Sequence, residues 1–183
     1  MSWVKTWMLT FILALGASAS AQTQTPAPPV RAQDPYAAYA FYIGEWTTSL
    51  PGGGPAVAVQ RFRWGPSRAY ITYSTSNLEG GRERLHFEGI FVYNAANRNM
   101  DFLFALEPGS LGQEHGTLEV QSDGSIVRNV TLISPNGEIG RFRQTFWRRG
   151  PNDASTSLLR QDASGAWAPT FPGSDNLTMQ RRT

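Results

Sequence analysis

The stretch Phe41-Tyr42-Ile43-Gly44-Glu45-Trp46-Thr47-Thr48 marks the point at which the folded part of the chain begins. Before it the chain is rich in alanine, proline and threonine. After it, runs of about 6–10 residues rich in β-branched and aromatic side chains alternate with turn residues. The stretch therefore predicts the first of a series of short β-strands.

Turn signals recur at regular intervals along the rest of the chain. Asp123-Gly124 and Asn136-Gly137 are pairs that favour the positive φ angles of tight hairpins. No sustained 3.6-residue periodicity follows Gly44, which argues against crossover helices. About ten strands fit between the turns, and this spacing is typical of a sandwich or a meandering barrel. Residues 36–41, preceded by Asp34-Pro35, favour a short N-terminal helical turn.

The first 21 residues have the layout of a secretory signal peptide. Lys5 supplies the positive charge, residues 7–15 form the apolar region, and Ala19-Ser20-Ala21 is a small-residue cleavage site. The apolar run is shorter than the roughly 20 residues that span a bilayer. We therefore expect cleavage after Ala21, a periplasmic or secreted protein, and no transmembrane segment in the mature chain.

Three regions are expected in the whole chain. Residues 1–21 are the signal peptide, residues 22–35 are a proline-rich linker, and residues 36–183 are the β-barrel domain. The chain has no cysteine, which excludes a disulfide framework. The domain must therefore be held together by its core.

Charge and ligand-type residues argue against several classes of partner. The formal net charge is +2, and the arginine pairs at 148–149 and 181–182 are typical of strand ends rather than of a nucleic-acid contact. His86 and His115 are the two histidines of the chain. A zinc site needs three or four ligands in close array. We expect no nucleic-acid partner, no metal and no cofactor.

Alternation along the strands separates a core face from an outer face. Residues 100, 102, 104 and 106 are apolar and share one face of a predicted strand. Phe142, Gln144 and Phe146 share one face of a later strand. In a barrel of eight to ten strands, such a face fills a lumen just wide enough for side chains or one small ligand.

Gly44-Glu45-Trp46 resembles the Gly-x-Trp signature that opens the first strand in the lipocalin and calycin superfamily. Residues 88–97 resemble a strand and hairpin of a bacterial lipocalin-like family of unknown function. This resemblance implies an antiparallel up-and-down barrel of about 8–10 strands. It also implies structural roles for Gly44 and Trp46, with Trp46 closing one end of the barrel and Arg181 or Arg182 packing over its ring.

His86-Phe87-Glu88 is similar to a His-x-Glu strand of the nitrobindin branch, whose barrels bind haem. Those barrels hold iron through a histidine of the C-terminal strand. Residues 176–181 of this chain contain no histidine. The resemblance therefore gives no reason to expect haem.

The leading hypothesis is an exported lipocalin-like barrel that binds a small, apolar or amphipathic molecule. An interior site of this kind is mostly apolar with a few placed polar groups. Candidate ligand-binding residues are Tyr73, His86, Glu88, Phe102 and Gln144, with Arg61 and Arg63 for an acidic head group.

Two alternatives remain open at the level of the sequence. The first is an isomerase, hydratase or hydrolase in which His86 is the base and Glu88 orients it, because residues two apart on a strand share a face. The second is an envelope interaction module whose barrel is filled by its own side chains. Lumen volume depends on strand tilt and shear, which the sequence does not determine.

Overall fold

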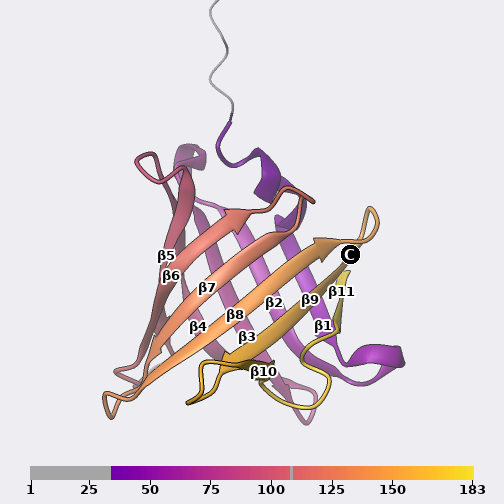
Figure 1. The fold of residues 1–183 in the computed structure, drawn as a ribbon. Coiled ribbons are helices and arrows are strands. Elements are labelled where there is room, and N and C mark those ends of the chain that lie inside the picture. Colours follow the sequence, from indigo (N-terminus) through magenta and orange to yellow (C-terminus); the bar gives the residue numbers. More distant parts are fainter. Residues whose placement is uncertain (1–33, 108) are drawn as a thin grey trace, which may run out of the picture. The chain divides into compact units, whose positions relative to one another are not determined.

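Ten antiparallel strands close into an up-and-down barrel, which confirms the predicted fold class (Figure 1). The computed structural model describes residues 34–107 and 109–183. The predicted signal peptide, residues 1–21, and the linker up to residue 33 lie outside the described residues.

The elements follow the predicted turn signals. The strands are β1 (Gly44–Ser49), β2 (Ala56–Trp64), β3 (Ile71–Glu79), β4 (Arg82–Asn94), β5 (Asn99–Leu106), β6 (Gln113–Val120), β7 (Ile126–Ile133), β8 (Ile139–Arg148), β9 (Asp153–Gln161), β10 (Trp167–Pro169) and β11 (Leu177–Arg181). Three short 3₁₀ helices complete the described chain: η1 (Ala37–Tyr42), η2 (Pro51–Gly53) and η3 (Pro66–Arg68).

The sheet closes because β9 uses both of its edges. One edge pairs with β8, from Phe142 opposite Arg160 to Arg148 opposite Ala154. The other edge pairs with β11 and, further along, with the three-residue strand β10. Since β11 also pairs with β1, ten strands form the ring, and β10 lies outside it as an additional strand.

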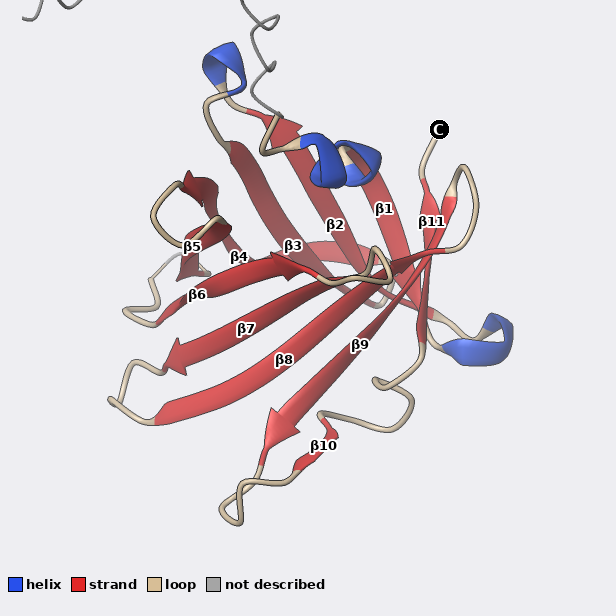
Figure 2. Cartoon of the chain, turned by 45° about the horizontal axis from the view of Figure 1, so that its top comes forward, coloured by secondary structure: helices blue, strands red, loops and turns tan. Residues whose placement is uncertain are grey.

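The up-and-down order gives the barrel two different ends. The plugged end carries η1 and the β2–β3, β4–β5, β6–β7 and β8–β9 connections. The far end carries the β1–β2, β3–β4, β5–β6 and β7–β8 connections together with residues 162–176, which include β10. In Figure 1, η1 is at the top and β10 is at the bottom, and Figure 2 brings the plugged end forward.

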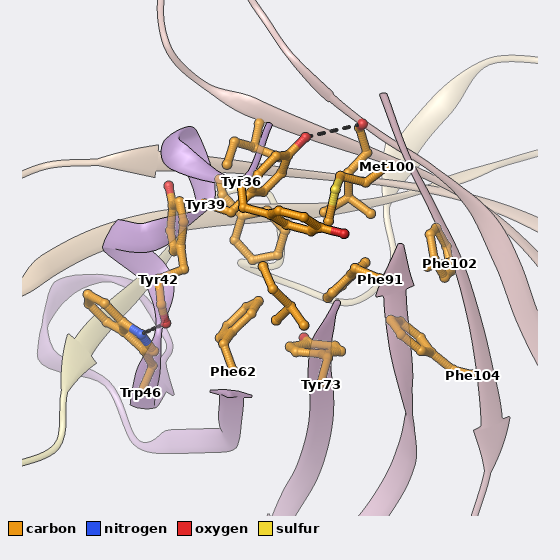
Figure 3. Packing of buried hydrophobic residues seen from close by; sticks show 14 of the residues in the cluster. Tyr36, Tyr39, Tyr42, Trp46, Phe62, Tyr73, Phe91, Met100, Phe102 and Phe104 are labelled. Carbon is orange, nitrogen blue, oxygen red and sulfur yellow. Dashed lines mark hydrogen bonds between the residues drawn. The ribbon is translucent and has the colours of Figure 1, made fainter. Parts of the chain in front are cut away.

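Aromatic side chains fill the plugged end (Figure 3). Tyr39 and Tyr42 of η1 point into the barrel and are buried. The ring of Tyr42 lies 6.0 Å from that of Phe62 on β2 and 5.6 Å from that of Phe146 on β8, centroid to centroid. A helix that contacts strands on several sides of the ring therefore closes this end with apolar surface.

Trp46 lies at the base of this plug and is fully buried. Its indole N–H donates a hydrogen bond to the backbone oxygen of Tyr42 at 2.7 Å (Figure 3). The guanidinium of Arg181 packs over the indole, 4.4 Å from the ring centroid. It also donates to the backbone oxygens of Ile43 and Phe41, both at 2.6 Å. Arg181 therefore ties the last strand to the start of the first.

Gly44 permits this close approach. Its φ is +133°, and a Cβ atom there would lie 2.6 Å from Nη1 of Arg181. A larger residue would displace the guanidinium as well as strain the backbone. The Gly-x-Trp pattern thus has a geometric meaning: glycine leaves room for the arginine that covers the tryptophan.

Replacing Arg181 by alanine should lower the free energy of unfolding by about 3 kcal/mol, because charge-assisted hydrogen bonds and a cation–π contact are lost together. The matched control is Arg182→Ala. The Arg182 side chain is 44% exposed and pairs with Glu45 and Glu83 on the surface. Its loss should cost at most about 1 kcal/mol. Urea unfolding followed by tryptophan fluorescence measures both, and equal losses would contradict the role given to Arg181.

Alkaline pH should weaken the plug. Burial raises the pKa of Tyr42 to about 12, although Arg148 and Arg149 oppose the shift. An unfolded tyrosine ionises near pH 10, so the stability gained from Tyr42 is complete below that pH and is lost as the pH rises towards 12. At pH 11 the loss is about 1.4 kcal/mol. Urea midpoints at pH 9 and pH 11 measure this loss for the parent and for Tyr42→Phe. The variant should lose less stability than the parent between the two pH values, and equal losses would refute the role given to Tyr42.

Candidate functional site

The far half of the barrel is hollow. A cavity of about 410 Å³ lies between the aromatic plug and the far end. Most of its wall is apolar and includes Val57, Ala58, Val130, Leu132, Phe142 and Leu158. Thr170 and Phe171, from the segment that follows β10, line the cavity at the far end. The volume lies within the range of roughly 300–1,000 Å³ typical of small-molecule sites.

One group of polar side chains in the wall is satisfied internally. The hydroxyl of Tyr73 donates to Oε1 of Gln60 at 2.7 Å and accepts from Oγ1 of Thr75 at 2.8 Å. Gln60 in turn donates to Oγ1 of Thr48 at 2.8 Å. Burial raises the pKa of Tyr73, and the charge of Arg128 opposes this only in part. Tyr73 is therefore a neutral, hydrogen-bonded phenol at neutral pH.

Arg128 on β7 carries a positive charge into the interior. Its side chain is 4% exposed, and its guanidinium lies 5.4–5.7 Å from the centroids of four aromatic rings. These rings belong to Tyr73, Phe87, Phe102 and Phe104. A cation–π interaction stabilises a cation by about 0.5–2 kcal/mol. This is much less than the free energy needed to remove an ion from water. The charge therefore needs a further partner.

Glu114 on β6 is that partner only in part. Its Oε2 lies 3.7 Å from Nη2 of Arg128, which is an ion pair without a hydrogen bond. Within the described chain, Nε and Nη1 of Arg128, Oε2 of Glu114 and Oε1 of Gln144 are buried and have no hydrogen-bond partner. Leaving one such polar atom unsatisfied costs about 1–3 kcal/mol. Several of them at one cavity leave hydrogen-bonding capacity that the described protein atoms do not use.

The structure separates the two residues of the predicted catalytic pair. His86 lines the cavity, whereas Glu88 lies on the outer surface beside a groove between β2, β3 and β4. The expectation that they share a face is wrong because of a β-bulge. Thr75 pairs with Phe87 while Ser76 pairs with Leu85, so His86 is the extra residue and turns inward.

The other predicted site residues fall into three places. Tyr73 and Gln144 line the cavity, and Phe102 belongs to the aromatic cluster beside Arg128. Arg61 and Arg63 line the outer groove with Glu88. Arg61 also forms ion pairs with Glu45 and Glu83. Hydrogen bonds from Arg61 and Arg182 lower the pKa of Glu83. Arg61 and Arg63 therefore do not face the cavity.

The sequence analysis does not include Arg128 and Glu114 among the candidate residues. The alternation of inward-facing and outward-facing residues along β6 and β7 nevertheless places both on the inward face. Arg128 shares a strand face with the buried residues Ile126 and Val130, and Glu114 shares one with Leu118. A charged residue in register with core residues is rarely buried unless another group pairs with it.

In residues 34–107 and 109–183, no group of three histidine, cysteine, aspartate or glutamate side chains is arranged to hold a metal ion. Over the same residues, no helix is long and apolar enough to cross a membrane.

The Arg128–Glu114 pair should behave as a coupled unit in stability measurements. Arg128→Met leaves Glu114 buried without a counter-charge and should lower the free energy of unfolding by about 3 kcal/mol. The double variant Arg128→Met/Glu114→Gln should recover to within about 1 kcal/mol of the parent, because no buried charge remains. A double-mutant cycle by urea unfolding measures this, and strictly additive losses would show that the two side chains do not interact.

No protein-family model matches this chain, and no curated protein matches it either. The closed ten-strand antiparallel barrel is compatible with a lipocalin-like fold.

Proposed function

We propose that this protein is an exported, lipocalin-like barrel that binds a small amphipathic molecule in the hollow half of its lumen. One observation carries the proposal. A cavity with a mainly apolar wall contains buried polar atoms of Arg128, Glu114 and Gln144 that lack hydrogen-bond partners in the described chain. A ligand with an apolar body and a polar group would satisfy both kinds of surface at once.

The division of the barrel supports binding over a purely structural role. Aromatic side chains fill the plugged half, so the fold has a core without the far half. A barrel serving only as an interaction module has no need of a buried guanidinium whose Nε and Nη1 are unsatisfied. Export is supported by the signal-like first 21 residues. Membership of a lipocalin-like family is supported by Gly44, Trp46 and Arg181, which are arranged as that resemblance implies.

Catalysis by the His86–Glu88 pair is less well supported than binding. Glu88 lies outside the barrel and His86 inside, so the carboxylate is not placed to orient the imidazole. The other polar residues of the cavity include a charged pair and hydrogen-bonded amides and hydroxyls, which favour holding a ligand.

Native mass spectrometry of the protein purified gently from cells that express the full chain tests the proposal directly. A reproducible excess mass that disappears on denaturation would support a bound small molecule. Fractionating the same cells and measuring the mass of the chain tests export, because cleavage after Ala21 leaves a product that begins at Gln22.

Filling the cavity should weaken the binding of a neutral fluorescent probe, N-phenyl-1-naphthylamine. Leu132→Trp adds bulk on the cavity wall, and we expect at least a tenfold rise in the dissociation constant of the probe. Leu103→Trp is the matched control, because Leu103 is 54% exposed on the outside of β5. Equal binding by both variants would place the probe outside the cavity and refute the proposed site.

A further inference from the structure

The unsatisfied atoms at the cavity form a mixed set of donors and acceptors. Arg128 offers the N–H groups of Nε and Nη1, while Glu114 and Gln144 each offer one unpaired oxygen. Arg128 and Gln144 are direct partners in the β7–β8 ladder, and Glu114 lies 3.7 Å from the guanidinium. Side chains opposite each other on neighbouring strands lie within contact distance. The four atoms therefore belong to one site.

Gln144 is already fixed in orientation. Its Nε2 donates to Oγ1 of Thr156 at 3.2 Å, so the amide oxygen is the free end. The neighbouring group of Thr48, Gln60, Tyr73 and Thr75 is hydrogen-bonded within itself. The groups left to bind a ligand are therefore two acceptor oxygens and one guanidinium.

Charge balance argues against a bare anion. The buried site holds one positive side chain and one negative side chain, so it is neutral as a pair. A carboxylate ligand would satisfy Arg128 but would bring a second negative charge next to Glu114. It would also leave both acceptor oxygens unpaired, because a carboxylate has no hydrogen to donate.

We propose that the cavity selects an amphipathic ligand with a neutral head group that accepts and donates hydrogen bonds together, and that a terminal carboxamide matches it best. This inference rests on the proposed function. A carboxamide oxygen accepts from the guanidinium, and its two N–H groups match the two free oxygens of Glu114 and Gln144. Its apolar chain then lies against Val130, Leu132 and Phe142.

Competition against N-phenyl-1-naphthylamine tests the choice of head group on the unmodified protein. The competitors are octanamide, octanoate and the methyl ketone of equal length, all at pH 8, where octanoate is ionised. We expect octanamide to bind at least tenfold more tightly than octanoate. The methyl ketone, which accepts but does not donate, should bind several-fold more weakly than octanamide.

Glu114→Gln tests the cause of this preference. Removing the negative charge should raise the affinity for octanoate, relative to the affinity for octanamide, by at least tenfold. Glu119→Gln is the matched control, because Glu119 lies on the same strand, is exposed, and loses the same charge on substitution. It should leave the ratio of the two affinities unchanged. Thermal melting of both variants confirms that the compared proteins are folded.

Two results would overturn the inference while leaving the proposed function intact. One is a parent protein that binds octanoate as tightly as octanamide. The other is a preference that Glu114→Gln does not change. If the probe itself fails to bind, or binds equally to Leu132→Trp, then the proposed function fails, and the inference fails with it.

Discussion

The contact between Arg181 and Trp46 is the constraint on which the barrel depends. It joins the final strand to the first turn of the domain, and these segments are separated by almost the whole folded chain. An up-and-down barrel is built from local hairpins, and only its closure requires partners that are distant in sequence. The β1–β11 ladder makes this long-range link, and one arginine, positioned by a glycine and an indole, reinforces it at the end where η1 seals the lumen.

Arg181 stabilises the fold, whereas Arg128 weakens it. It brings a charge into a space lined by aromatic rings and leaves polar atoms unsatisfied. A well-packed apolar residue at this position would commonly be as stable or more stable. Buried charges that weaken a fold are concentrated at sites that perform a task. This energetic cost is the physical support for the proposed ligand.

The fold was largely predictable from the sequence, whereas the site was predictable only in part. Strand positions and their inward faces depend on local chemistry. They can therefore be predicted from turn pairs such as Asp123-Gly124 and from alternating apolar residues. The bulge at His86 depends on pairing with β3, and a one-residue shift reverses the face of a side chain. Arg128 and Glu114 come from separate strands, and their meeting depends on barrel register. Strand β10 is three residues long and lies outside the ring, which strand spacing alone does not reveal.

The split of the lumen into a filled half and a hollow half has an evolutionary consequence. Most of the aromatic core lies at the plugged end, so substitutions on the cavity wall leave much of that packing intact. A descendant chain could therefore change the shape and polarity of this cavity through a few lumen residues without first acquiring a stronger core. Two barrels with the same Gly-x-Trp start and the same arginine clamp can then differ in the cavity that they enclose. The opening motif thus fixes how the barrel closes, and the far half of the lumen fixes the shape and polarity of its cavity.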